Sequence, residues 1–162
     1  KKYWGIENNF NLFDTGNFDK LDNIIIGGRS DDVMTIRGHR IGSAEVESLL
    51  LSIENIVEAC AISYDDYLEG SVIILFIFFK KNLKNSTKKI KKILLENFGS
   101  YAIPKHIISL NQLPKTKSGK ILRGLIRSMI KGKHKTNPND ISTINDKKVI
   151  NDLLLKIKEL KI

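Results

Sequence analysis

Two polar stretches that contain glycine carry residues suited to phosphate chemistry. The first, residues 28–42, includes Arg29, Gly38 and Arg40. Arginine suits phosphate because its planar guanidinium donates two hydrogen bonds at once and keeps its charge. The two arginines bracket a predicted pair of strands, so they could contact one phosphate group from two sides, and Gly38 would let a ligand approach the backbone closely. An ordinary β-turn with Arg–Asp surface pairs accounts for the same residues.

The second stretch, residues 113–122, presents a Ser-Gly-Lys sequence just ahead of a predicted helix. It departs from a phosphate-binding P-loop, because Pro114 stands where that motif has its first glycine and Ile121 stands where it has Ser or Thr. What remains is a mobile loop that carries the Lys120 ammonium group. Such a group is suited to stabilise a reacting phosphate and carboxylate electrostatically. If this loop is considered alone, the alternative is that Lys120 is one of many surface lysines and has no role in catalysis.

The remaining ionisable residues indicate no further catalytic or metal site. The three histidines are scattered, without a second ligand at metal spacing, so we predict no metal. Asp31 and Asp32 are adjacent, and adjacent side chains of a strand point to opposite faces, which argues against a carboxylate pair for acid–base catalysis. Cys60 lies in an apolar run and is predicted to be a buried packing residue.

Length and composition restrict the class of protein. The chain has 162 residues, of which 41% are hydrophobic, enough for one domain or for a small domain with an appendage. Its single cysteine excludes a disulfide framework and a cysteine-based metal cluster. The longest apolar run, residues 72–79, is too short to span a bilayer, so we expect no membrane association. The chain starts at Lys1 without a secretory pattern, and we expect a fragment of a cytoplasmic protein.

The net charge of +9 comes mostly from lysine. Lysines concentrate in residues 80–92 and 115–135, where they alternate with Ile and Leu at helical spacing. They form either the solvated faces of helices or a surface that attracts polyanions. The chain shows neither the stacking aromatics nor the reading helix that nucleic-acid modules use. A phosphate-bearing small ligand is therefore the better target for the charge than nucleic acid.

Hydrophobic spacing and turn residues predict an α+β fold in which a small mixed β-sheet is flanked by helices. Ser43 has the character of an N-cap, and Gly99 ends a later helix. The predicted strands are 24–26, 33–37, 56–63, 71–79 and 105–110, with an acidic turn at 64–70. The predicted helices run through 46–53, 87–98, 122–129 and 150–157, and 131–140 has the composition of a linker.

Both polar stretches resemble motifs of the adenylate-forming acyl-CoA synthetases, in the C-terminal domain of that family. Residues 28–33, Gly-Arg-Ser-Asp-Asp-Val, and 37–47, Arg-Gly-His-Arg-Ile-Gly-Ser-Ala-Glu-Val-Glu, resemble the hinge and the strand after it. Residues 114–120, Pro-Lys-Thr-Lys-Ser-Gly-Lys, resemble the terminal catalytic-lysine motif. The order and separation of these motifs make the resemblance specific.

The resemblance covers nearly the whole chain and implies how it is divided. Residues 1–28 would be the end of the large N-terminal domain, a β-hairpin remnant, and residues 29–32 would be the hinge. Residues 33–131 would form the mobile C-terminal domain, and 132–162 a linker and a final helix. The implied partner of this chain is therefore the large domain of the same protein.

The segments 38–45, 99–104 and 139–143 are similar to the acetyl- and propionyl-CoA synthetase branch. That branch activates a short carboxylic acid with ATP to give an acyl-adenylate and pyrophosphate, then rotates its small domain and transfers the acyl group to coenzyme A. The large domain would bind most of the ATP and its Mg²⁺, so the chain alone would be inactive. The alternatives are a different acid–CoA ligase, a carrier-protein adenylation domain, or a basic nucleic-acid-binding module.

The resemblance also implies roles for single residues. Lys120 would contact the carboxylate and the α-phosphate during adenylation, and its acylation would switch that step off. Asp31 would be the hinge residue. Arg29 would hold ATP or its ribose, Arg40 would contact a nucleotide phosphate, and Gly38 would line the coenzyme A channel.

Two positions depart from the family pattern. Asn17, in Thr-Gly-Asn, stands where the family has an aspartate that binds both ribose hydroxyls. An amide can still bind one hydroxyl but brings no negative charge, so weaker nucleotide binding is expected. Leu95 stands where acetyl-CoA synthetases often have an arginine that contacts coenzyme A.

Overall fold

A three-stranded mixed sheet forms the centre of the computed structural model, which describes residues 9, 12–80, 86–132 and 147–160. Strand β5 (Ile56–Asp66) pairs antiparallel with β6 (Gly70–Phe79), which pairs in parallel with β7 (His106–Ser109). The central strand β6 is buried from Val72 to Ile77, as expected for a strand covered on both faces. The predicted small mixed sheet is confirmed.

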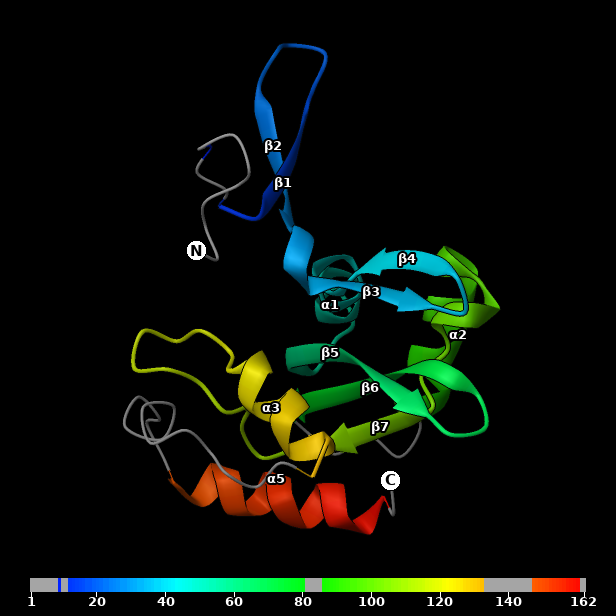
Figure 1. Ribbon diagram of the computed structural model, residues 1–162, viewed down its shortest axis with the longest axis vertical. Helices are drawn as coiled ribbons and strands as arrows, with labels where there is room; N and C mark the ends of the chain where they lie inside the picture. The colour runs from blue at the N-terminus through cyan, green and yellow to red at the C-terminus, as the bar shows by residue number, and fades with distance from the viewer. Residues whose placement is uncertain (1–8, 10–11, 81–85, 133–146, 161–162) are drawn as a thin grey trace.

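Helices cover both faces of this sheet (Figure 1). Side chains alternate along a strand, so Ile73 and Leu75 of β6 face one core while Ile74 and Phe76 face the other. Helices α1 (Ser43–Leu51) and α2 (Ser86–Phe98) pack in the first core. Helices α3 (Arg123–Ile130) and α5 (Lys147–Glu159) pack in the second, where Cys60 is fully buried as predicted.

A second pair of strands lies beside α1. Strands β3 (Val33–Ile36) and β4 (His39–Gly42) form an antiparallel hairpin with a two-residue turn. Arg37 and Gly38 have φ angles of 50° and 86°, the positive values that a type I′ turn requires. The strand predicted through residue 37 therefore ends one residue earlier, because Arg37 adopts the left-handed conformation.

A third antiparallel pair projects away from the rest of the molecule (Figure 1). It consists of β1 (Asp14–Phe18) and β2 (Ile24–Arg29), so the predicted strand at 24–26 is real but longer. Its large apolar side chains, Phe18, Ile24, Ile25 and Ile26, are exposed. The short 3₁₀ turn η1 (Ser30–Asp32) joins this hairpin to β3.

Two local predictions were wrong and one was confirmed. Ser43 was predicted to be the N-cap, but it is the first residue of α1 and is buried. The residue before the helix is Gly42, which is extended and provides no side-chain cap. The acidic turn is shorter than predicted, because β5 continues to Asp66, whose Oδ1 accepts the N–H groups of Leu68 and Glu69 at 2.9 Å. Gly99 does end α2, with a φ of 98°.

Most of the predicted linker, residues 133–140, lies outside the described residues. The final helix was predicted through 150–157 and is present as α5. Within the described ranges, no helix combines the length and apolar character needed to cross a membrane.

Candidate functional site

Lys120 lies in a small hairpin loop immediately before α3. Lys115 and Ile121 pair at its base in an antiparallel bridge. Thr116 organises the loop, because its N–H donates to the Lys120 carbonyl at 2.8 Å and its Oγ1 accepts the Lys120 N–H at 3.1 Å. Gly119 turns the chain with a φ of 87° and donates its N–H to the Thr116 carbonyl at 2.9 Å. The backbone of the loop is therefore internally bonded, and the Lys120 side chain is exposed.

Ion pairs attach both ends of this loop to the body of the domain. At the first end, the Lys115 ammonium group binds Glu58 of β5. At the second end, Arg123 in the first turn of α3 binds Glu47 of α1. One turn further along α3, Arg127 Nη2 lies 3.0 Å from Asp32 Oδ1 in η1.

Glu47 is the most enclosed of these charged groups. Its Oε1 accepts the N–H of Ala61 at 2.9 Å, and its Oε2 accepts a hydrogen bond from Arg123. Burial raises the pKa of the Glu47 carboxyl, although the Ala61 N–H and the Arg123 guanidinium act in the opposite direction. Burial, and then the nearby Glu47 charge, raise the pKa of the Cys60 thiol to about 12, so Cys60 is not a nucleophile.

The predicted hinge residue lies in the turn between the projecting hairpin and the sheet. Asp31 is the central residue of η1. Before it, the Ser30 N–H donates to the Phe13 carbonyl at 2.6 Å, and the Ser30 hydroxyl donates to the same oxygen at 3.1 Å. After it, Asp32 bonds to Arg127 of α3. The position of Asp31 is thus that of a junction between two separately bonded bodies.

Arg29 and Arg40 do not line a common cleft. Arg29 lies 3.8 Å from Asp14 and donates to the Leu12 carbonyl at 3.4 Å, both in the hairpin region. It also lines a cleft of about 190 Å³ beside η1, which Asp32 and Arg123 share and Arg40 does not. Arg40 is exposed on β4. Contact of both arginines with one phosphate group stays a prediction.

Gly38 lies at the exposed tip of the β3–β4 hairpin, where a Cβ would meet no atom within 4 Å. The residues on either side of it are fixed. Arg37 pairs with Glu69 at 3.0 Å, and the His39 ring stacks on Tyr101 with centroids 4.1 Å apart and planes 12° apart. Gly38 is therefore an open piece of backbone between two anchored side chains.

A cleft of about 440 Å³ adjoins this tip. Its cationic lining residues are Arg37, Lys91 and Lys105, and Tyr101 contributes an aromatic ring. Lys105 also binds Asp66 at 2.6 Å and Glu69 at 2.9 Å.

The Asp66 carboxylate is one of the two carboxylates that bind Lys105. The Lys105 hydrogen bond, and then the backbone N–H groups of Glu69 and Leu68, lower the pKa of Asp66 to about 2. The cleft is also lined by Glu69, so Arg37 and Lys105 are paired with carboxylates there, while Tyr101 stacks on His39.

Asn17 is exposed on β1, opposite Ile25 of β2. Strand β1 belongs to the projecting hairpin, which lies apart from α3 and the loop before it (Figure 1). Leu95 is exposed on α2. The predicted residues are therefore distributed over the hairpin, the β3–β4 tip and the Lys120 loop instead of converging in one pocket.

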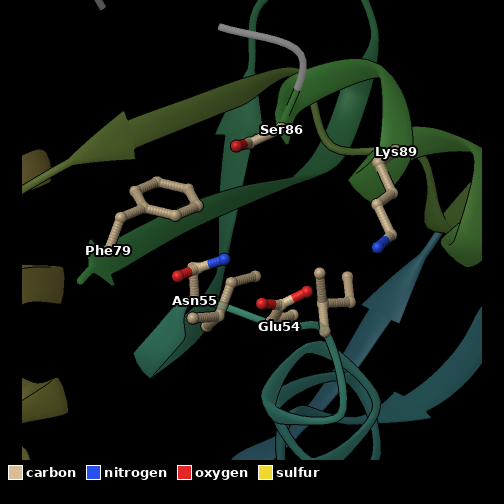
Figure 2. Close-up of a pocket in the computed structure, with 7 residues that line it drawn as sticks. Glu54, Asn55, Phe79, Ser86 and Lys89 are labelled. Carbon is tan, nitrogen blue, oxygen red and sulfur yellow. The ribbon is translucent and has the colours of Figure 1, made fainter. Parts of the chain in front are cut away.

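A further pocket contains none of the predicted residues. It has a volume of about 170 Å³ and lies where β5 begins, β6 ends and α2 begins. Glu54 and Lys89 both point into it, and the Phe79 ring forms part of its wall (Figure 2). Within the part of the chain that the structure describes, no three His, Cys, Asp or Glu side chains are grouped so that they could hold a metal ion.

Sequence reasoning missed the ion pairs that anchor the Lys120 loop. Arginine occurs at only five positions, and two of them, Arg123 and Arg127, are four residues apart on a predicted amphipathic helix. That spacing places both guanidinium groups on one face and was the available signal. Their acidic partners could not be chosen from sequence.

Comparison with known proteins gives the family. Residues 45–120 match the family model described as the AMP-binding enzyme C-terminal domain, and the match ends at Lys120. The chain therefore carries an AMP-binding enzyme C-terminal domain. The family predicted from the hinge and lysine motifs is confirmed.

Relatives of this AMP-binding enzyme C-terminal domain belong to longer proteins. Acetyl-coenzyme A synthetase 1 of Debaryomyces hansenii is 34% identical over 135 residues, covering 81% of this chain and 20% of its own. Propionate--CoA ligase of Salmonella typhimurium is 31% identical over 169 residues, covering 98% of this chain and 26% of its own. The chain thus spans about a fifth to a quarter of the length of these curated relatives.

Solved structures support the fold of the domain. ATP-bound MatB from Rhodopseudomonas palustris matches with a TM-score of 0.70 and 20% identity, covering 83% of this chain and 27% of its own. The anthranilate CoA ligase AuaEII in complex with anthranoyl-AMP matches with a TM-score of 0.65 and 28% identity. The match covers 74% of this chain and 24% of the AuaEII chain. The predicted fold class is confirmed.

Proposed function

We propose that this chain is the C-terminal part of an AMP-forming short-chain acyl-CoA synthetase that acts on acetate or propionate. The exposed Lys120 ammonium group, on an internally bonded loop at the end of the family match, is the observation that carries the proposal. The acetyl-CoA synthetase and propionate–CoA ligase relatives support the choice of a short acid. The large domain of the full-length protein would supply the acid pocket and most of the ATP site.

In the first half-reaction, a carboxylate oxygen attacks the α-phosphorus of ATP and pyrophosphate leaves. Lys120 donates hydrogen bonds to the carboxylate and α-phosphate oxygens, where negative charge accumulates in the transition state. Arg40 contacts a phosphate of the nucleotide, while Arg29 and Asn17 hold its ribose side. Mg²⁺ would accompany ATP, and the large domain would hold most of both.

In the second half-reaction, the coenzyme A thiol attacks the acyl carbonyl and AMP leaves. Rotation at Asp31 withdraws Lys120 and brings the β3–β4 tip to the active site. Gly38 suits a narrow channel, because it offers bare backbone to the pantetheine chain. The neighbouring cleft, with Arg37, Lys91 and Lys105, suits the phosphates of coenzyme A.

Replacing Lys120 separates the two half-reactions. In the full-length protein, Lys120→Ala is expected to lower the rate of acyl-adenylate formation by roughly 10²–10³, the effect of losing one preorganised donor. Thioester formation from supplied acyl-adenylate is expected to remain near the wild-type rate. Lys117→Ala, in the same exposed loop, is the matched control and should leave both rates unchanged. An equal loss in both half-reactions would overturn the role of Lys120.

Acylation of Lys120 is part of the same proposal. An acyl group on Nζ removes the positive charge that adenylation requires. The exposure of the side chain supports access by a modifying enzyme or a reactive acyl donor. The protein acylated at Lys120 should match Lys120→Ala in both half-reactions and should regain adenylation after deacylation.

A further inference from the structure

The hinge turn is bonded to a different body on each side of Asp31. Ser30 belongs to the hairpin side, because its N–H and its hydroxyl both donate to the Phe13 carbonyl, at 2.6 and 3.1 Å. Asp32 belongs to the sheet side, because its Oδ1 accepts a hydrogen bond from Arg127 Nη2 at 3.0 Å. Two consecutive peptide units therefore join residues that are fixed to separate parts of the molecule.

Arg127 connects this hinge to the element that carries the Lys120 loop. Helix α3 begins at Arg123, three residues after Lys120, and Arg127 follows one turn later. The Arg123 side chain binds Glu47, whose other oxygen holds the backbone of β5 at Ala61. The hinge, α3, α1 and β5 are thus joined by two charged pairs that share one helix.

The Asp32–Arg127 and Glu47–Arg123 ion pairs are partly buried. The side chains of Asp32 and Arg127 are 21% and 34% exposed, and those of Glu47 and Arg123 are 10% and 25% exposed. Salt screens partly buried pairs less than surface pairs, and hydrogen bonds between charged groups are shorter and stronger than neutral ones. By contrast, the Lys156–Glu159 pair of α5 is 40% and 65% exposed.

We propose that Asp32 and Arg127 are positioning residues that confine the domain rotation to Asp31 and transmit it to the Lys120 loop. While Asp32 is fixed to α3, a dihedral change on its N-terminal side must turn α3 together with the sheet. Without the pair, the flexible joint extends through residue 32 to the start of β3 at Val33, and one hinge angle no longer determines where Lys120 lies. The expected effect on adenylation rests on the proposed function. The confinement of the rotation to Asp31 does not.

The mechanical part is tested by spin labels in the full-length protein. Labels on Lys20→Cys in the hairpin turn and Lys117→Cys in the lysine loop report the orientation of the sheet body relative to the hairpin. Both positions are exposed, whereas Cys60 is buried with a raised pKa and resists labelling. Pulsed electron-spin measurements give the distribution of label distances.

The variants are Arg127→Met, Asp32→Asn and the exchanged pair D32R/R127D, with Lys156→Met as the control for loss of an ion pair elsewhere. We expect a clearly broader distance distribution for both single variants, and the wild-type width for the exchanged pair and the control. Asp32→Asn preserves shape, so it decides the question if Arg127→Met folds poorly. Wild-type widths in the folded single variants would overturn the proposal, as would an exchanged pair that stays broad.

The catalytic part is tested by adenylation kinetics of the same proteins. Displacing Lys120 by about 1 Å would lower kcat by roughly 10- to 100-fold. We expect this loss in Arg127→Met, with the KM for ATP nearly unchanged and kcat restored by the exchanged pair. An unchanged kcat would overturn the link to Lys120. If the wild-type protein forms no adenylate, the proposed function fails while the distance distributions still decide the hinge mechanism.

Discussion

At the scale of single residues, the proposed chemistry would depend on where one compact positive charge is held. Lys120 is exposed, but the hydrogen bonds of Thr116 and the turn at Gly119 fix the backbone from which it extends. A flexible stem on a fixed loop allows the ammonium group to follow charge that moves between carboxylate and phosphate oxygens. In the proposed function, rotation of the domain would withdraw the same side chain.

The amide at position 17 gives a prediction about nucleotide affinity. A carboxylate accepts stronger hydrogen bonds from ribose hydroxyls than an amide does, by about 1 kcal/mol. Asn17→Asp in the full-length protein should therefore lower the Kd for ATP by about fivefold. Equilibrium titration measures this, with Asn111→Asp as the control for an added charge at another exposed asparagine. An unchanged or weaker Kd would show that Asn17 does not contact the ribose.

Replacing Gly38 tests the second half-reaction, as replacing Lys120 tests the first. A Cβ there meets no atom within 4 Å, and the positive φ costs about 1–2 kcal/mol, so we expect Gly38→Leu to fold. The added side chain would obstruct the coenzyme A channel of the full-length protein. We expect adenylation to persist while thioester formation falls by at least an order of magnitude. Loss of adenylation in a folded Gly38→Leu protein would contradict this role.

At the scale of elements, the helices were easier to predict than the short strands. The apolar spacing of Leu125, Ile126 and Met129 identified α3, and that of Leu153 and Ile157 identified α5, because each helix has one buried face. Hydrophobic spacing did not reveal strands β1 and β4, since both are short and mostly exposed and so lack an apolar alternation. A hairpin within residues 1–28 was expected only from the family resemblance.

The site was predictable where chemistry lies in local sequence and not where it depends on tertiary contacts. The motifs located the Lys120 loop and the turn at Asp31, whose role as a hinge stays a prediction. The partners of α3 could not, because Arg123 and Glu47 are 76 positions apart and Arg127 and Asp32 are 95 apart. Many acidic residues would have satisfied the sequence equally well, and only the packing of α3 selects these two.

The tip of the β5–β6 hairpin gives a prediction about acid stability. Lys105, and then the backbone N–H groups of Glu69 and Leu68, lower the pKa of Asp66 to about 2 from its ordinary value of 3.8. The ionised form is therefore favoured by folding, and its contribution is present above pH 3.8 and is lost as the pH falls toward 2. Lys105→Met should be less stable near neutral pH and should lose less stability over this acid range.

Thermal unfolding followed by circular dichroism between pH 2 and 5 measures the effect. Lys92→Met removes an exposed ion pair with Glu96 on α2, and it is the control for loss of a lysine. The control should show the wild-type pH dependence. If Lys105→Met loses as much stability as the wild-type protein between pH 5 and 2, Lys105 is excluded as a cause of the lowered pKa of Asp66.

At the scale of the whole molecule, the chain has one packed body and one projecting hairpin. The exposed Phe18, Ile24 and Ile26 make the hairpin a surface that favours contact with another part of a protein. The assignment of residues 1–28 to the large domain stays a prediction. The chain spans about a fifth to a quarter of its curated relatives, and in those proteins the rest of the chain would supply that partner.

Isotope transfer in the full-length protein tests the central claim most directly. The protein is given ATP, coenzyme A and acetate or propionate labelled with ¹⁸O in its carboxylate, and the products are analysed by mass spectrometry. Attack of the carboxylate on the α-phosphorus, followed by thiolysis at the acyl carbon, leaves one ¹⁸O atom in AMP. We expect one labelled oxygen in the AMP formed with each acyl-CoA. Label in inorganic phosphate, or unlabelled AMP, would contradict adenylate chemistry.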